Sequence, residues 1–198
     1  MKLAKIGAVA AFAMVAATQA QAQNFYGSVG AGVLVPEKLD ITIGTAAGQA
    51  KFDTGYAIHT ALGYDFGNGL RSELELGLND TGFKSARAGA TNYGISGGDI
   101  DQLTLHAAAY YDFAMGSVSP YVGGGLGLTR TDIDTFTMGT VTTAGDRATD
   151  FSMFGEAGVS IPVTDRLAIV PGVRYSWVDT SGSNMTAWTF KTALRFAF

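Results

Sequence analysis

The sequence predicts an all-β fold in which eight antiparallel strands run up and down around a closed barrel. Three observations lead to this prediction. Apolar residues recur at every second position after Gln23, which is the spacing of a strand with one apolar face. The connections between the alternating segments are short and long in turn. No stretch after Gln23 has the 3.6-residue period of a convincing amphipathic helix.

The composition is that of a folded chain with few charges. Charged residues make up 15% of the 198 residues, compared with about 25% in an average protein. The 11% of aromatic residues argues against disorder, and the 27 glycines follow no collagen period. The absence of cysteine excludes disulfides, thiolate metal sites and cysteine nucleophiles. A formal net charge of −4 argues against a nucleic-acid-binding surface.

The first 22 residues have the pattern of an export signal. Two lysines open the chain, residues 6–17 are uncharged and mostly apolar, and Ala20-Gln21-Ala22 is a small-x-small cleavage site. The alternative is a membrane anchor, but the apolar run is shorter than the roughly 20 residues that span a bilayer. We therefore expect cleavage after Ala22, with a signal peptide over 1–22 and a barrel domain over 23–198.

The last segment, 187–198, shows the alternation best. One face carries Trp188, Phe190, Leu194 and Phe196, and the other carries Lys191 and Arg195, which are costly to place in lipid or in an apolar core. The charged face must therefore meet water or paired charges. The other seven segments are 24–35, 54–66, 70–79, 102–113, 119–130, 151–163 and 166–178.

The connections between these segments indicate a membrane protein. An even number of strands with tight turns at one end and long loops at the other is typical of a transmembrane β-barrel, and closure leaves no sheet edge in lipid. The sequence thus predicts an eight-stranded antiparallel up-and-down transmembrane β-barrel, with both ends of the barrel chain in the periplasm. The short turns lie at 67–69, 116–118 and 164–166, and the long loops at 37–51, 80–99 and 131–149, with a shorter one near 180–185.

A soluble, lipocalin-like barrel with a ligand inside is the structural alternative, because periodicity alone does not tell which face points outward. The aromatic residues favour the membrane barrel. They lie in two rows, one beside the short turns and one beside the long loops, as in the interfacial girdles of membrane barrels. The expected girdle residues are Tyr56, Tyr64, Phe66, Phe113, Phe151, Trp177 and Trp188.

The polar face carries charges at mid-strand, which we expect to pair in the lumen. Glycines such as Gly123, Gly125 and Gly172 are expected to make room for these side chains. Eight strands enclose a space just wide enough to be filled by side chains, so a plugged lumen is expected and a wide porin channel is excluded. The alternative is a narrow gated pore in which the carboxylates exchange partners. The lumen charges are Arg71, Glu73, Glu75, Glu156, Arg174, Lys191 and Arg195.

The C-terminal residues Lys191-Thr-Ala-Leu-Arg-Phe-Ala-Phe198 resemble the assembly signal of bacterial outer-membrane proteins, with Lys191, Phe196 and Phe198 at its key positions and Ala193 where glycine is usual. Together with Pro120–Leu128 and Gly172–Ser176, they make the chain similar to the small opacity-type and outer-membrane-protein-A-like barrels of the porin-like family.

This resemblance implies a cell outer membrane location in a Gram-negative envelope. The implied role is structural or surface-interactive, meaning envelope integrity, adhesion through the loops, or a surface antigen. The implied partners are outer-membrane lipids and lipopolysaccharide, the export translocon, periplasmic chaperones, the outer-membrane barrel assembly machine and a host or cell-surface ligand. We expect a monomer.

The residues do not favour catalysis. His59 and His106 both fall on the polar face, and no His-x-Ser arrangement of the kind found in small lipid A deacylases occurs. We therefore expect no enzyme activity, no cofactor and no metal site. The basic loop residues Lys84, Arg87, Arg130 and Arg147 are either solvated or in contact with lipopolysaccharide phosphates and their bridging divalent ions.

Overall fold

The computed structural model describes residues 24–43, 46–88, 91–180 and 183–198, so the signal peptide expected over 1–22 lies outside the described residues. Within these ranges, no helix is long and apolar enough to cross a membrane. The strands are β1 (Phe25–Pro36), β2 (Leu39–Ile43), β3 (Ala46–Phe52), β4 (Gly55–Asp65), β5 (Leu70–Ala88), β6 (Thr91–Gly97), β7 (Asp99–Asp112), β8 (Ser119–Ile133), β9 (Phe136–Met138), β10 (Val141–Thr143), β11 (Asp146–Thr164), β12 (Leu167–Thr180) and β13 (Ser183–Ala197).

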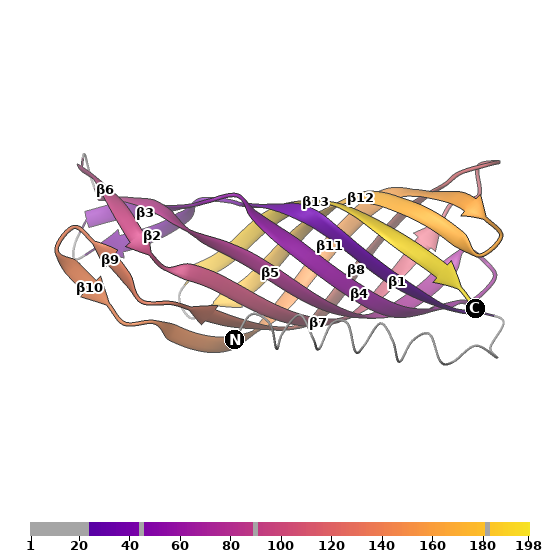
Figure 1. The fold of residues 1–198 in the computed structure, drawn as a ribbon, viewed down its shortest axis with the longest axis horizontal. Coiled ribbons are helices and arrows are strands. Elements are labelled where there is room, and N and C mark those ends of the chain that lie inside the picture. Colours follow the sequence, from indigo (N-terminus) through magenta and orange to yellow (C-terminus); the bar gives the residue numbers. More distant parts are fainter. Residues whose placement is uncertain (1–23, 44–45, 89–90, 181–182) are drawn as a thin grey trace.

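Eight of these strands close into a ring, in the order β1, β4, β5, β7, β8, β11, β12, β13 and back to β1. Every neighbouring pair in the ring is antiparallel. The first and last strands meet along their length, from Tyr26↔Ala197 to Pro36↔Ala187. They lie side by side in Figure 1, where β1 is indigo and β13 yellow. The predicted eight-stranded up-and-down barrel is confirmed.

The apolar face of the ring points outward. Leu126 is 60% exposed and Phe190 is 58% exposed, whereas Glu75 is only 1% exposed. A soluble barrel has the opposite arrangement, with its apolar side chains inside and its polar ones in water. The outward apolar face therefore belongs in lipid, and the lipocalin-like alternative does not hold.

Short connections join β4 to β5, β7 to β8 and β11 to β12 at one end of the barrel, which we call the turn end. The β4–β5 turn needs glycine, because Gly67 and Gly69 have φ angles of 76° and 86°. The chain both enters and leaves the barrel at this end, where the Phe198 amide donates to the Phe25 carbonyl.

We call the opposite end the loop end. Strands continue there in place of the long loops that the sequence predicted. Strands β5 and β11 each run for 19 residues, well beyond the 9–11 that crossing a bilayer requires. Their additional residues fall in the segments 80–99 and 131–149, where loops were expected. Here strand β5 pairs with both β3 and β6. An outer sheet results, with the order β2, β3, upper β5, β6, β9, β10.

An aromatic cluster ties the outer sheet together. The Phe83 ring on β5 lies 5.3 Å from that of Phe52 on β3 and 5.2 Å from that of Phe136 on β9, measured between ring centroids. These contacts join the β2–β3 hairpin, β5 and the β9–β10 hairpin. The extension is therefore a packed sheet and not a set of separate loops.

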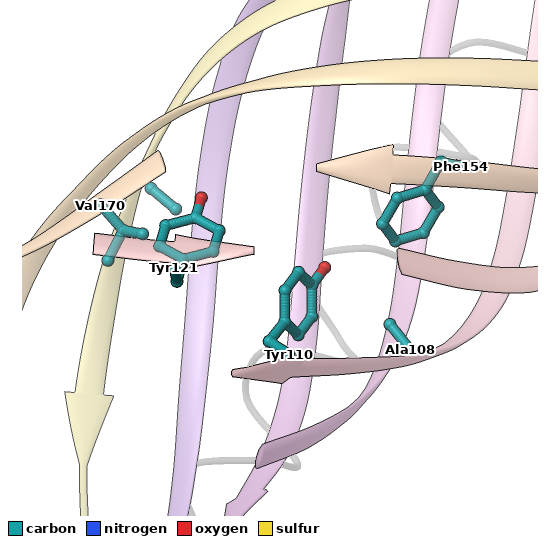
Figure 2. Packing of buried hydrophobic residues seen from close by; sticks show 6 residues of the cluster. Ala108, Tyr110, Tyr121, Phe154 and Val170 are labelled. Carbon is teal, nitrogen blue, oxygen red and sulfur yellow. The ribbon is translucent and has the colours of Figure 1, made fainter. Parts of the chain in front are cut away.

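Aromatic side chains fill much of the lumen toward the turn end. Tyr110, Tyr121 and Phe154 form a buried cluster with Ala108 and Val170 (Figure 2). Glycines in the wall make space for these rings, since a Cβ on Gly123 would lie 2.3 Å from the Tyr110 ring and one on Gly125 would lie 2.6 Å from the Phe154 ring. The glycines of this wall thus accommodate aromatic rings rather than the charged side chains for which we expected them to make room.

Candidate functional site in the barrel lumen

Arg174 on β12 is the centre of an ion-paired layer that crosses the lumen. Its Nη2 atom donates to Glu75 Oε2 at 2.7 Å, and its Nη1 atom to Glu75 Oε1. Its Nε atom donates to Glu156 Oε2 at 2.6 Å. Lys191 Nζ contacts the same Glu156 oxygen at 2.9 Å and lies 3.8 Å from Glu75 Oε2. We call these four residues the central layer.

Aromatic groups complete the central layer. The Arg174 guanidinium lies 3.7 Å from the centroid of the Phe154 ring. The Tyr121 hydroxyl donates to Glu156 Oε1 at 2.8 Å, so both oxygens of this carboxylate are bonded. A buried charge requires such partners, because its desolvation costs several kcal/mol.

A second group of charges lies between the central layer and the turn end. Arg71 contacts Glu73 Oε1 at 2.5 Å and Asp112 Oδ2 at 2.9 Å, and its guanidinium lies 4.1 Å from the centroid of the Tyr110 ring. Arg195 lies 3.7 Å from the same Asp112 oxygen, and its Nη2 atom donates to Ser160 Oγ at 2.6 Å. We call Arg71, Glu73, Asp112 and Arg195 the lower layer.

The structure brings all seven predicted lumen charges into these two layers and adds Asp112 to them. Four cations (Arg71, Arg174, Lys191 and Arg195) face four carboxylates (Glu73, Glu75, Asp112 and Glu156), so the formal charge of the two layers sums to zero. Sequence reasoning missed Asp112. Asp112 lies two residues after Tyr110 on β7. Residues two apart in a strand share a face, so the sequence could have placed Asp112 in the lumen with Tyr110.

Two cavities lie on either side of the central layer. The upper cavity, toward the loop end, has a volume of about 60 Å³, which is room for on the order of four water molecules. The lower cavity has a volume of about 20 Å³. His59, Glu75 and Lys191 line both cavities, so these side chains form the partition between them.

Both histidines lie in the lumen, as the sequence predicted, and both line the upper cavity. Spacing along the chain assigned no partner to His106, whereas in the structure its Nε2 atom lies 2.8 Å from Ser152 Oγ, and Thr129 donates to that oxygen at 2.8 Å. His106 Nδ1 and His59 Nε2 have no hydrogen-bond partner in the described part of the chain. This serine–histidine pair therefore lacks the carboxylate that orients the base in a catalytic triad.

The predicted girdle residues lie near the two ends of the ring. At the turn end, the Tyr64 and Phe66 rings are 5.0 Å apart, and Phe113 contacts Tyr111 at the same centroid distance. Toward the loop end, Phe151 contacts Trp177 at 6.3 Å. Trp188 contacts Tyr175, which was not predicted, at 4.8 Å, and Tyr56 is 46% exposed.

A carboxylate joins the Tyr175–Trp188 pair on the outer wall. Glu37 accepts hydrogen bonds from the Thr186 hydroxyl at 2.8 Å, the Tyr175 hydroxyl at 3.1 Å and Trp188 Nε1 at 3.2 Å. The Thr186 and Tyr175 hydrogen bonds lower the pKa of the Glu37 carboxyl, because they stabilise its charged form. This cluster fastens the segment after β1 to β12 and β13.

The proposed assembly-signal residues all belong to the end of the chain that closes the ring. Lys191 points inward to the central layer, while Phe196 is 41% exposed on the outer face. Phe198 lies at the turn end beside Phe25. Among the described residues, no group of three or more His, Cys, Asp or Glu side chains could hold a metal ion.

Comparison with known families decides the identity of the fold. Residues 7–198 match the family described as outer membrane protein beta-barrel domain. The chain belongs to this family. Its place is therefore the cell outer membrane, with the outward apolar face in lipid. In this type of barrel the short turns are periplasmic and the long connections are extracellular, which places the outer sheet outside the cell.

Solved structures of other outer-membrane barrels have the same fold. Neisserial surface protein A aligns with a TM-score of 0.61 and 22% identity over 88% of this chain and 97% of that one. OprG from Pseudomonas aeruginosa aligns with a TM-score of 0.58 and 18% identity over 89% of this chain and 97% of that one. Ail, the attachment invasion locus protein of Yersinia pestis, aligns with a TM-score of 0.51 and 16% identity over 87% of this chain and 99% of that one. A comparison with curated proteins gave no match.

Proposed function

We propose that this barrel is a surface-interaction protein that presents its outer sheet to the cell exterior, as a support for envelope contacts, adhesion or antigen exposure. The observation that carries the proposal is the outer sheet itself. Strands β5 and β11 extend far beyond the bilayer, and the Phe52–Phe83–Phe136 cluster packs the extension into one unit. An ordered platform costs less conformational entropy on binding than separate flexible loops do.

The similarity to Ail, whose name denotes attachment and invasion, supports the same proposal. The partner would meet the β9–β10 hairpin first, because residues 139–149 are all exposed. The barrel wall, by contrast, is covered by lipid and closed at its centre by the two charged layers. The extracellular end is therefore the part of the molecule available to a second cell or a host surface.

The test is a hairpin replacement in the intact protein. Residues 135–145 are replaced by Asn-Gly in cells that display the protein, and adhesion of these cells to epithelial monolayers is counted. We expect the variant to retain its boiling-dependent shift on a denaturing gel and to lose most of its adhesion. A matched replacement in the turn-end segment 114–117 should leave adhesion unchanged. Adhesion of the unaltered protein at the level of an empty vector would refute the proposal.

A narrow gated pore is the second candidate, favoured by the two cavities. The partition between them consists of His59 and the central-layer residues Glu75 and Lys191, and Lys191 lies close enough to both Glu75 and Glu156 to exchange between them. Movement of these side chains would join the cavities into one path. Single-channel recording in planar bilayers tests this. We expect Glu156→Ala to raise conductance, and conductance equal to protein-free bilayers in both proteins would exclude the pore.

We further propose that the protein is not an enzyme. The His106–Ser152 pair faces the lumen, and among the described residues no group bonds His106 Nδ1 to orient the imidazole as a base. Lipid A from cells that overproduce the protein should therefore keep the mass it has in cells producing His106→Ala. A mass change that depends on His106 would overturn this.

We also propose that the terminal strand ending at Phe198 guides insertion by the outer-membrane assembly machine, after translocation and delivery by periplasmic chaperones. Its aromatic outer face and its terminal aromatic residue support this. Phe198→Ala should slow the appearance of the heat-modifiable form in cells, whereas Phe113→Ala, at the same end of the barrel, should not.

A further inference from the structure

The β4–β5 turn at the turn end contains an asparagine that is followed directly by a glycine, Asn68 and Gly69. The Asn68 side chain is exposed, and its Oδ1 atom accepts a hydrogen bond of 3.1 Å from the Leu70 amide. This contact forms an Asx turn, in which the side chain folds back onto the backbone two residues further on. The side-chain carbonyl carbon of Asn68 is therefore held beside the amide nitrogen that lies between them, that of Gly69.

The Gly69 nitrogen is accessible to this carbonyl carbon. Its N–H has no acceptor among the described residues, although the Gly69 carbonyl accepts a hydrogen bond of 2.7 Å from the Asp112 amide. No side chain shields the nitrogen, because the position requires glycine. The φ angle of Gly69 is 86°, and a Cβ there would lie 2.8 Å from the Asp112 carbonyl oxygen. The turn thus presents an unshielded nitrogen to a carbonyl group that is already oriented.

We propose that Asn68 is a self-modification site, at which the Gly69 nitrogen attacks Asn68 Cγ. A C–N bond forms as the Gly69 nitrogen loses its proton to water. The Cγ–Nδ2 bond then breaks, and Nδ2 takes a proton from water and leaves as ammonia. A succinimide ring remains, and water opens it at either carbonyl to give aspartate or isoaspartate, so nothing is oxidised or reduced.

The geometry of the turn favours both parts of this reaction. Attack within one turn needs no encounter of separate molecules, which is the advantage of a held geometry. The negative charge of the tetrahedral intermediate develops on Asn68 Oδ1, where the Leu70 N–H already donates. The backbone therefore stabilises this oxyanion with a donor that is in place before the reaction begins.

Formation of isoaspartate would change the lower layer through Asp112. Isoaspartate adds one methylene to the backbone immediately before Gly69, whose carbonyl holds the Asp112 amide. The Asp112 side chain in turn contacts Arg71 at 2.9 Å and lies 3.7 Å from Arg195. The modification therefore loosens the carboxylate that these two arginines share.

Ageing of the detergent-refolded protein in mildly alkaline buffer tests the proposal. Peptide mapping by mass spectrometry measures the conversion, and enzymatic methylation of isoaspartate identifies the product. We expect Asn68 to convert at least as fast in the folded barrel as in the same protein unfolded in urea, with isoaspartate as the main product. Asn92, which is also exposed but precedes Tyr93, should convert about tenfold more slowly or less, a barrier difference of about 1.4 kcal/mol. Asn68→Gln should not convert, because its amide carbon lies one bond further from the Gly69 nitrogen.

Urea unfolding of the aged protein tests the effect on the lower layer. We expect aged protein to unfold at a lower urea concentration than fresh protein, and aged Asn68→Gln to keep the fresh value. Fresh Asn68→Asp carries the new charge on an unaltered backbone and should also keep it. Conversion of Asn68 that is tenfold slower in the folded barrel than in urea, or no faster than that of Asn92, would overturn the proposed site. An equal loss of stability in Asn68→Asp would overturn the proposed effect of the longer backbone.

Discussion

Arg174 and Glu75 bind each other across the full width of the barrel. They are 99 positions apart in the sequence, and their strands, β12 and β5, stand opposite each other in the ring of eight. The pair therefore connects two walls that share no backbone hydrogen bond.

Removing Arg174 should strongly destabilise the barrel. Arg174→Met leaves Glu75 and Glu156 with reduced compensation, and breaking a buried pair costs about 3–5 kcal/mol. Urea unfolding of the detergent-refolded protein, followed by heat-modifiability, measures the change. The double variant Glu75→Gln/Arg174→Met should recover part of the loss, because one uncompensated charge is gone. Arg166→Ala in an exposed turn should change stability by less than about 0.5 kcal/mol. Equal stability of Arg174→Met and the unaltered barrel would contradict this account.

A methyl group added at Gly123 should lower the stability of the folded barrel, and one added at Gly155 should not. A Cβ at Gly123 would lie 2.3 Å from the Tyr110 ring and 2.5 Å from the Ala109 carbonyl oxygen. Overpacking of this kind costs about 1–3 kcal/mol. Gly155 faces outward, and a Cβ added there would meet no atom within 4 Å. Comparing the unfolding midpoints of Gly123→Ala and Gly155→Ala measures the difference, and equal midpoints would refute the packing role of Gly123.

The Glu37 cluster should respond to acid. The pKa of the Glu37 carboxyl is lowered in the folded protein. The stability that this carboxylate contributes is therefore present above the ordinary pKa of a glutamate and is lost as the pH falls through the lowered value. In a Trp177→Phe background, Trp188 is the only tryptophan, and its fluorescence should change below about pH 4.3. The change should be absent in Glu37→Gln. A transition that persists in that variant would assign it to another group.

Phe83 should control the order of the outer sheet without affecting the barrel. It contacts both Phe52 and Phe136, and each aromatic pair contributes about 0.5–1.5 kcal/mol. Phe83→Ala should therefore speed proteolytic cleavage in the outer sheet several-fold while the heat-modifiable core persists. Tyr93→Ala removes an exposed ring on β6 and serves as the control. Unchanged cleavage in Phe83→Ala would show that the backbone pairing alone orders the sheet.

The alternation of side chains predicted the strands of the ring and which charges share a face, and the two rows of aromatic residues predicted that the apolar face points outward. The alternation did not predict the partners of these charges, because pairing across the lumen depends on the relative shift of strands such as β5 and β12, which a period of two does not encode. Nor did it predict the outer sheet. Beyond the bilayer no face of β5 meets lipid, so Lys84, Ser85 and Arg87 interrupt the regular alternation of apolar residues that marks a strand in the membrane.

The Arg174–Glu75 contact has a consequence for the order of assembly. Glu75 lies on the third strand of the ring in sequence order, whereas the guanidinium of its partner Arg174 lies on the seventh. A half-built barrel thus holds a carboxylate whose counter-ion has yet to arrive, and Lys191 follows only with the final strand. We expect partial barrels that lack the last two strands to be less stable than the closed ring, because a carboxylate without its counter-ion is costly to bury.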